Sequence, residues 1–488
     1  MKRWIWVVLL AMGCSFCNGV AKAASAVGEI GVSDGTPAET IVCPPPAPRE
    51  IYPGEEWVWA ASPEVLGWSS AKLAAARDYA ESIGSAAVMI VDAGVVIDAW
   101  GDLTRNYNCH SMRKSLLSAL YGIYVDEGTI DITQTLEQLG IDDLTPLTQI
   151  ERQASVDDLL TARSGVYIPA AGEAQSMIDM RPERGSHASG TFWYYNNWDF
   201  NALGTIFDQE TGEVSIYDAF RRRIAEPLEM QDFRAGLLRY SYVPYSAHPY
   251  YGFRMSTRDL ARFGLLFLRE GRWKNRRIIP SDWIQESTSA HAQIGPESGY
   301  GYMWWTGERS GLFPNVTIAG HGYYASGYRG HLVVVLPYLD LVIVHRVDTF
   351  EPAGDVPSET FGMLLWMILD AAGETDIGEP PFIDLAPGIR LAGNEVQAAI
   401  SGSRLVAVGG ALQTEVINDP DGTLSILFDG KIVYTGRWWV DGDRYCADVP
   451  DADDIGGCFD VMMDGNLLRL FELDGTLSIV FSVLNRTP

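Results

Sequence analysis

The chain has little histidine and few positive charges, and each shortage removes a class of function. Only seven of its 488 residues are histidines, and none forms H-E-x-x-H or another tight metal-binding spacing. Lysine and arginine number 36 against 63 acidic residues, so the formal net charge is −27. Such an acidic chain repels phosphate backbones, which disfavours nucleic-acid binding. A phosphate loop and a dinucleotide fingerprint are also missing, and we expect no cofactor and no metal.

Long apolar runs are missing after the first residues. Residues 332–344 come nearest, but Pro337 and Asp340 interrupt them, so we expect no transmembrane segment in the mature chain. Hydrophobic residues nevertheless make up 47% of the chain, which is typical of a globular protein with more than one core.

The N-terminus has the layout of a secretory signal peptide. A basic start is followed by an apolar run over residues 4–17 and by the small-x-small site Ala21-Lys22-Ala23. The run is shorter than the roughly 20 residues that span a bilayer. We therefore expect a signal peptide over 1–23 and an exported protein, periplasmic or secreted, with lipidation at Cys14 as the alternative.

Cysteines are few, and two of the six, Cys14 and Cys17, lie in the signal. Export makes disulfides available to the other four. Cys446 and Cys458 are close together in a strand-rich region and are the expected pair. A pairing of Cys43 with Cys109 has no support from spacing.

Residues 24–55 are rich in Ala, Gly, Ser and Pro and are interpreted as a flexible linker. They contain a G-x-S-x-G pattern at residues 31–35. That pattern marks a nucleophile only between a strand and a helix, and neither is expected here. We treat it as coincidental.

Residues 56–375 are predicted to form an α+β domain. The pattern gives a helix over 70–83, a hairpin over 86–100, mostly helices over 103–290, strands over 316–346 and a helix over 358–371. Burying all of these elements favours an antiparallel sheet built from both ends of the domain, flanked by helices, with a separate helical lobe. We expect the active site in the cleft between the lobes.

A second domain is predicted after the boundary at residues 379–381. Turn signals recur about every ten residues over 388–488, which is typical of a β-meander, sandwich or small barrel. We therefore expect a small all-β domain there, without an assigned function.

The strongest chemical signal is the S-x-x-K motif that begins at Ser111 and ends at Lys114. Residues three apart share a helix face, so the two side chains can meet. A serine hydroxyl needs a base, and a lysine amine can serve if burial or positive charge lowers its pKa. The same pattern occurs at Ser69 and Lys72, but there the serine is better interpreted as a helix cap.

Several segments resemble the serine β-lactamase-related hydrolases in the same order along the chain. They are Ser111 to Leu117 with 125–128, 157–166, Tyr195-Asn196-Asn197 with 203–204, 258–264 and 300–305. The resemblance covers about 56–372 and includes class C β-lactamases, family VIII esterases and 6-aminohexanoate-dimer hydrolases. It implies a β-lactamase/transpeptidase-like fold and an acyl-enzyme on Ser111.

The resemblance also implies roles for Tyr195 and Asn197. A tyrosinate at Tyr195 would share proton transfer with Lys114, and Asn197 would hold Lys114 and the substrate carbonyl. Tyr194 offers a competing register for the Y-x-N element. We prefer Tyr195 because its distance to residues 203–204 fits the family.

The third family element, Lys- or His-x-Gly on a strand, is altered in this chain. His321 is the candidate replacement for the lysine, although a lone histidine is equally well explained as structural. Ala325 or Ser326 would supply the second oxyanion N–H beside that of Ser111. The absent lysine weakens the interpretation as a β-lactamase.

These residues predict a serine hydrolase, a carboxylesterase or amidase, that cleaves a small ester or amide, with β-lactams included. Within enzymes, the alternative is a D-aminopeptidase or carboxypeptidase on cell-wall peptides. The alternative from another class is a catalytically silent binding protein that uses the same cleft. A covalent serine probe separates an enzyme from a binder.

Overall fold

The computed structural model describes residues 51–350, 354–374, 389–407, 414–428, 431–450, 456–464, 467–471 and 477–486. The predicted signal peptide, nearly all of the predicted linker, residues 379–381 and Cys43 lie outside them. Among the described helices, none has both the length and the apolar character needed to cross a bilayer.

An eight-stranded antiparallel sheet forms the centre of the N-terminal domain, in the order β2-β1-β14-β13-β12-β11-β10-β9. Its strands are β1 (Ser85–Asp92), β2 (Val95–Gly101), β9 (Ala292–Gln293), β10 (Ser298–Tyr300), β11 (Trp305–Arg309), β12 (Ile318–Gly327), β13 (His331–Leu336) and β14 (Leu341–Val347). β1 pairs with β14, so the two ends of the domain meet in one sheet. This confirms the predicted sheet. The strands β9 to β11 are additions that the sequence pattern did not predict.

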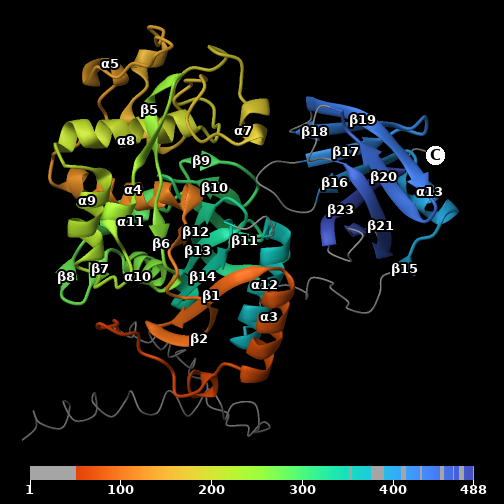
Figure 1. Ribbon diagram of the computed structural model, residues 1–488, viewed down its shortest axis with the longest axis horizontal. Helices are drawn as coiled ribbons and strands as arrows, with labels where there is room; N and C mark the ends of the chain where they lie inside the picture. The colour runs from red at the N-terminus through yellow and green to blue at the C-terminus, as the bar shows by residue number, and fades with distance from the viewer. Residues whose placement is uncertain are drawn as a thin grey trace, which may run out of the picture. The chain divides into compact units, whose positions relative to one another are not determined.

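Helices cover both faces of the sheet, which explains why every residue of its central strands β13 and β14 is buried (Figure 1). On one face, Val88 and Ile90 pack with α3 (Ser70–Ser82) and α12 (Ser358–Ala371). On the other face, Met89 and Val91 belong to the core of the helical lobe. The two terminal helices thus share a face, as predicted.

The lobe consists of short helices joined by long irregular segments. Its helices are η2 (His110–Met112), α4 (Arg113–Asp126), α5 (Leu136–Leu139), η3 (Glu151–Gln153), α6 (Val156–Leu160), α7 (Gln175–Asp179), α8 (Asn197–Thr211), α9 (Ile216–Phe220), η4 (Arg221–Ala225), η5 (Ala235–Leu237), α10 (Thr257–Leu268) and α11 (Ser281–Ser287). Small strand pairs interrupt them: β3 (Tyr107–Asn108) with β6 (Arg254–Met255), β4 (Tyr240–Val243) with β5 (Ser246–Tyr251), and β7 (Arg272–Trp273) with β8 (Arg276–Arg277). The prediction of a mostly helical insert therefore holds only in part.

α10 lies close against the sheet because it carries a glycine at the contact. A Cβ on Gly264 would lie 2.5 Å from a side-chain methyl of Val342. Two buried helices, α4 and α10, thus share one core with the sheet. This core supports the N-terminal end of α4.

The C-terminal region forms a second antiparallel sheet that curls until β21 pairs with β22. Its strands are β15 (Ile389–Arg390), β16 (Ser403–Ala407), β17 (Thr414–Asn418), β18 (Thr423–Phe428), β19 (Lys431–Asp441), β20 (Arg444–Asp448), β21 (Gly457–Asp464), β22 (Leu467–Phe471) and β23 (Leu477–Arg486). Of the predicted options, a small barrel is therefore confirmed. One helix, α13 (Asn394–Ile400), departs from the all-β expectation and buries Val396 and Ile400 in the barrel core.

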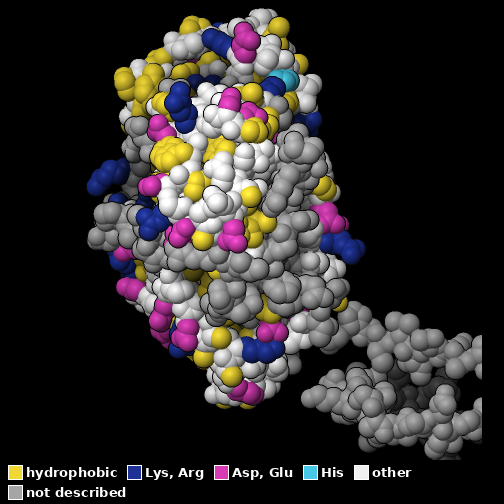
Figure 2. Space-filling view, turned by 90° about the vertical axis from the view of Figure 1, so that its right-hand side faces the viewer, with side chains coloured by type: hydrophobic (Ala, Val, Ile, Leu, Met, Phe, Trp, Pro, Cys, Tyr) yellow, Lys and Arg dark blue, Asp and Glu magenta, His cyan; other side chains and the backbone are white. Residues whose placement is uncertain are grey.

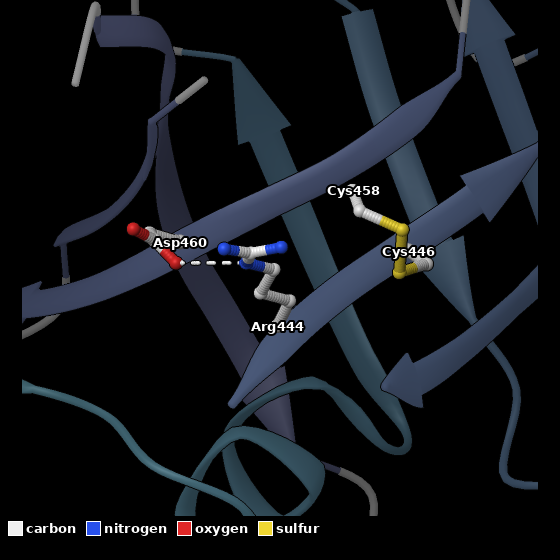
Figure 3. The surroundings of a disulfide bond; sticks show 4 residues. All are labelled: Arg444, Cys446, Cys458 and Asp460. Atoms are coloured by element: carbon white, nitrogen blue, oxygen red, sulfur yellow. Dashed lines mark hydrogen bonds and ion pairs between the residues drawn. A yellow bond between two sulfur atoms is a disulfide. The ribbon is translucent and has the colours of Figure 1, made fainter. Parts of the chain in front are cut away.

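A disulfide joins Cys446 on β20 to Cys458 on β21, as predicted from the sequence (Figure 3). The two residues are directly opposite each other in the strand register. Beside them, Arg444 and Asp460 form an ion pair at 3.3 Å. Cys109 is buried and has a free thiol.

The net charge of −27 is not gathered into one acidic patch on the face drawn in Figure 2. Acidic and basic side chains are dispersed among polar and apolar groups there.

Candidate active site

Ser111 lies in a tight turn at the start of a buried helix. It occupies η2, and α4 begins two residues later at Arg113. His110 has a φ of 45°, in the left-handed region that non-glycine residues seldom adopt. Its Nε2 lies 2.9 Å from Oγ1 of Thr349. The turn thus holds Ser111 half-buried at the edge of the lobe.

Strand β12 passes directly beside this turn. A Cβ added to Gly327 would lie 2.5 Å from the backbone oxygen of Cys109, so only glycine allows the approach. The end of β12 and the nucleophile turn therefore line the same site.

The structure brings together Ser111, Lys114 and Tyr195. The Nζ of Lys114 lies 2.8 Å from Oγ of Ser111 and 2.7 Å from Oη of Tyr195. The lysine is only 2% exposed, with its Nζ against the rings of Tyr195 and Phe200 at 4.4 and 4.7 Å. One buried amine thus connects the serine and the phenol.

The protonation states of this trio follow from burial and charge. Burial, with the nearby charge of Arg113, holds the pKa of Lys114 well below its usual value. Burial raises the pKa of Tyr195 to about 12. Both shifts favour the uncharged forms, a neutral amine and a protonated phenol. This direction disfavours the tyrosinate expected from the family resemblance.

The structure distinguishes the two tyrosine registers. The hydroxyl of Tyr194 donates to the backbone oxygen of Met177 at 2.6 Å, and that of Tyr195 meets Lys114. Tyr195 is thus the tyrosine of the site.

Asn197 lies near the site but does not make the predicted contact with Lys114. As the first residue of α8, it donates through Nδ2 to the backbone oxygen of Gly172 at 2.5 Å. Its Oδ1 is buried and has no partner within the described chain. The amide therefore binds the facing loop and leaves one acceptor free.

The predicted oxyanion residues lie on the stretch of β12 next to the nucleophile turn. β11 pairs with β12 only as far as Trp305 opposite Tyr324. Beyond that pair, β12 continues through Ala325 and Ser326 while bonded to β13 on its other side. This stretch has an edge toward the site where a backbone N–H can face an oxyanion beside that of Ser111.

His321 makes no hydrogen bond to the trio among the described residues, so its predicted role is not supported by a contact. It lies on β12, six residues before Gly327. Its Nε2 lies 2.9 Å from the backbone oxygen of Thr288. His321, between two glycines, resembled the His-x-Gly element of the family. The spacing of residues along the chain did not show which part of β12 passes the turn at Ser111.

Asp199 is a supporting residue that the sequence analysis missed. It is completely buried and accepts hydrogen bonds from Oγ of Ser164 at 2.5 Å and Nδ2 of Asn196 at 2.9 Å. Burial raises the pKa of its carboxyl well above the usual value. Its only sequence signal is an acid among apolar residues directly after the Y-x-N element.

Aromatic rings extend from the phenol of Tyr195. Trp305 lies 5.4 Å from the Tyr195 ring, and Trp193 and Tyr324 lie 5.9 and 6.2 Å from Trp305. All four are partly exposed. These four rings, the aromatic wall, present an apolar surface. Within the described residues, no group of three His, Cys, Asp or Glu could hold a metal ion.

The Beta-lactamase family model matches residues 71–365, which include all three residues of the trio. No curated protein matches the chain. Similar solved structures include an octameric penicillin-binding protein homologue from Pyrococcus abyssi, with 16% identity and a TM-score of 0.48 over 84% of this chain and 99% of that one. A class C β-lactamase mutant has 16% identity and a TM-score of 0.47 over 62% and 98%. A 6-aminohexanoate-dimer hydrolase candidate from Bacillus anthracis has 18% identity and a TM-score of 0.47 over 61% and 81%.

Proposed function

Because the chain belongs to the Beta-lactamase family, we propose that it is a serine hydrolase that forms an acyl-enzyme on Ser111. The observation that carries the proposal is the buried amine of Lys114, 2.8 Å from the Ser111 hydroxyl. A serine next to a neutral amine can lose its proton as it attacks a carbonyl. The signal-like N-terminus supports export to the periplasm or the exterior.

The proposed reaction has two halves that use the same groups. Lys114 takes the Ser111 proton while Oγ bonds to the carbonyl carbon, and backbone N–H groups of Ser111 and β12 receive the oxyanion. Tyr195, protonated and hydrogen-bonded to Lys114, donates to the leaving oxygen or nitrogen as the scissile bond breaks. The Lys114 ammonium then returns its proton to Tyr195, which restores the neutral amine and phenol. Water attacks the acyl carbon while Lys114 takes its proton, and Lys114 passes that proton to Oγ of Ser111 as the acyl–oxygen bond breaks and the acid leaves.

The surroundings of the trio favour an uncharged ester or amide with an apolar group. The aromatic wall offers apolar contact beside Tyr195. β12 carries no lysine, the residue that helps β-lactamases bind a substrate carboxylate. A β-lactam is therefore the less favoured substrate.

The test uses a fluorophosphonate probe and a short-chain nitrophenyl ester with the wild-type protein and Ser111→Ala. We expect labelling and turnover in the wild type and neither in the variant. Ser69→Ala is the matched control and should keep both. If neither wild-type labelling nor turnover is found, the protein is a binding protein. Labelling that survives in Ser111→Ala would assign the nucleophile to another serine.

A further inference from the structure

Arg113 is a fully buried cation one residue before Lys114, and the proposed reaction does not use it. Its guanidinium lies between two tyrosine rings, with its carbon 4.1 Å from the centroids of Tyr250 and Tyr251. Its Nη2 donates a hydrogen bond to Oδ1 of Asn201 at 2.8 Å. Nε and Nη1 are buried without a partner in the described part of the chain.

A buried arginine is ordinarily neutralised by a carboxylate, because removing a lone charge from water is costly. Arg113 has no such partner among the described residues, where no Asp or Glu oxygen lies within 4.0 Å of its nitrogens. The amide of Asn201 and the tyrosine rings stabilise the cation without cancelling its charge. The positive charge therefore acts on its neighbours undiminished.

The other titratable groups near Arg113 do not compensate for it. Tyr217 on α9, Tyr251 on β5 and Tyr300 on β10 all feel its charge, yet burial raises the pKa of each phenol, so they remain neutral. On α8, Asp199 is hydrogen-bonded to Ser164 and Asn196, and Asp208 accepts from Tyr240. Burial raises the pKa of both carboxyls.

The groups that face Lys114 include no carboxylate that would neutralise an ammonium ion. They are the hydroxyls of Ser111 and Tyr195 and the ring of Phe200, together with Arg113 itself. Two positive charges on adjacent buried residues repel each other strongly where the dielectric constant is low. The lysine can relieve this repulsion by releasing its proton, whereas arginine cannot.

We propose that Arg113 is a positioning residue that keeps the Lys114 amine neutral, and so ready to accept the Ser111 proton, by holding an uncompensated positive charge beside it. This inference rests on the proposed function. It gives a role to Arg113, the third residue of the S-x-x-K segment, where the motif allows any residue. A purely structural arginine would instead be expected to donate to carboxylate or backbone oxygens, as Arg262 on α10 does.

The test measures kcat/KM for a nitrophenyl ester, and the rate of fluorophosphonate labelling, at pH 6 and pH 9. Without the charge, Lys114 takes up a proton at higher pH, so the acidic limb of the profile moves toward alkaline pH. For Arg113→Met we expect a loss relative to wild type that is at least about tenfold greater at pH 6 than at pH 9. An equal loss at both pH values would overturn the proposal.

One further variant separates charge from packing. Asn201→Asp places a carboxylate against the intact guanidinium and should move the acidic limb in the same direction as Arg113→Met. If Arg113→Met does not fold, as judged by circular dichroism, Asn201→Asp decides: an unchanged profile there overturns the proposal.

Arg262 on α10 supplies a matched control. It too is completely buried, but its guanidinium donates to backbone oxygens of Leu228, Gly54 and Glu55, far along the chain from the site. Arg262→Met should cost stability and leave the ratio of activities at pH 6 and pH 9 unchanged. Failure of the proposed function is recognised separately, because the wild type itself would then show no Ser111-dependent labelling.

Discussion

The chain contains the S-x-x-K pattern twice, first at Ser69 to Lys72 and again at Ser111 to Lys114, and the two copies lie in opposite environments. Ser69 caps α3, accepting from the backbone N–H of Lys72, and the side chain of Lys72 is 50% exposed and paired with Asp370 at 2.7 Å. Ser111 lies before α4, and Lys114 is buried beside it without a carboxylate. In both copies the motif places the serine and the lysine close together. Only the surroundings of the second copy can turn the lysine into a base.

The lysines should show the largest contrast. Lys114→Ala removes the amine that contacts Ser111, and we expect ester turnover to fall by about a thousandfold or more. Lys72→Ala breaks a half-exposed ion pair and should leave kcat/KM within about twofold. Steady-state kinetics on both variants tests the contrast, and comparable losses in the two would break it.

Adjacent tyrosines sharpen the same comparison. Tyr195→Phe removes the hydroxyl 2.7 Å from Lys114 and should reduce kcat by about a hundredfold. Tyr194→Phe loses only a hydrogen bond to Met177, so its activity should match the wild type while its stability falls by about 1 kcal/mol. A larger kinetic loss in Tyr194→Phe would mean that the wrong register was chosen.

Acid should affect the core on the sheet face that carries α3 and the first copy, where His345 packs against Phe361 of α12. Burial lowers the pKa of His345 to about 4, against about 6.5 in an unfolded chain. Above pH 6.5 neither state binds the proton. As the pH falls from 6.5 toward 4, only the unfolded state takes it up, and the free energy of unfolding drops. Between pH 7 and pH 5 this residue should account for about 2 kcal/mol.

The measurement is urea unfolding at both pH values. Buried carboxyls such as Asp199 act in the opposite sense, so the informative quantity is a difference between two proteins. His345→Gln should lose about 2 kcal/mol less than the wild type over this interval. Equal losses in the two proteins would show that His345 is not kept neutral by the fold.

The smallest effect is expected at Ser69. Ser69→Ala removes a helix cap and should lower the free energy of unfolding by about 1 kcal/mol with unchanged ester turnover. Thermal melts alongside kinetics measure both. Any substantial loss of turnover would contradict the assignment of the first copy as a cap.

Local patterns predicted the elements near the ends of the N-terminal domain well. The helix over 358–371 matches α12, and α3 and the β1–β2 hairpin lie where the periodicity indicates. The strands β9 to β11 were missed because they are short and carry glycines and mixed polarity. Their place in the sheet depends on backbone pairing with β12, which a pattern read within each short segment does not reveal.

The sequence predicted the part of the candidate site whose residues are close together along the chain. Ser111 and Lys114 lie three residues apart, so a helix start is enough to bring them together. His321 and Asn197 failed in their expected contacts because their positions depend on where β12 passes the turn and on which loop faces α8. Asp199 and Arg113 went unnoticed because their importance lies in burial.

The sequence by itself determined which side chains could react and how far apart they lie along the chain. It placed a serine and a lysine one turn apart twice, and an apolar helix after only one of them. The tertiary structure decided which lysine becomes a base. A pKa depends on solvation and on nearby charges. Those around Lys114 come from Tyr195 and Phe200, more than eighty residues away, and from Arg113, whose own surroundings only the fold assembles.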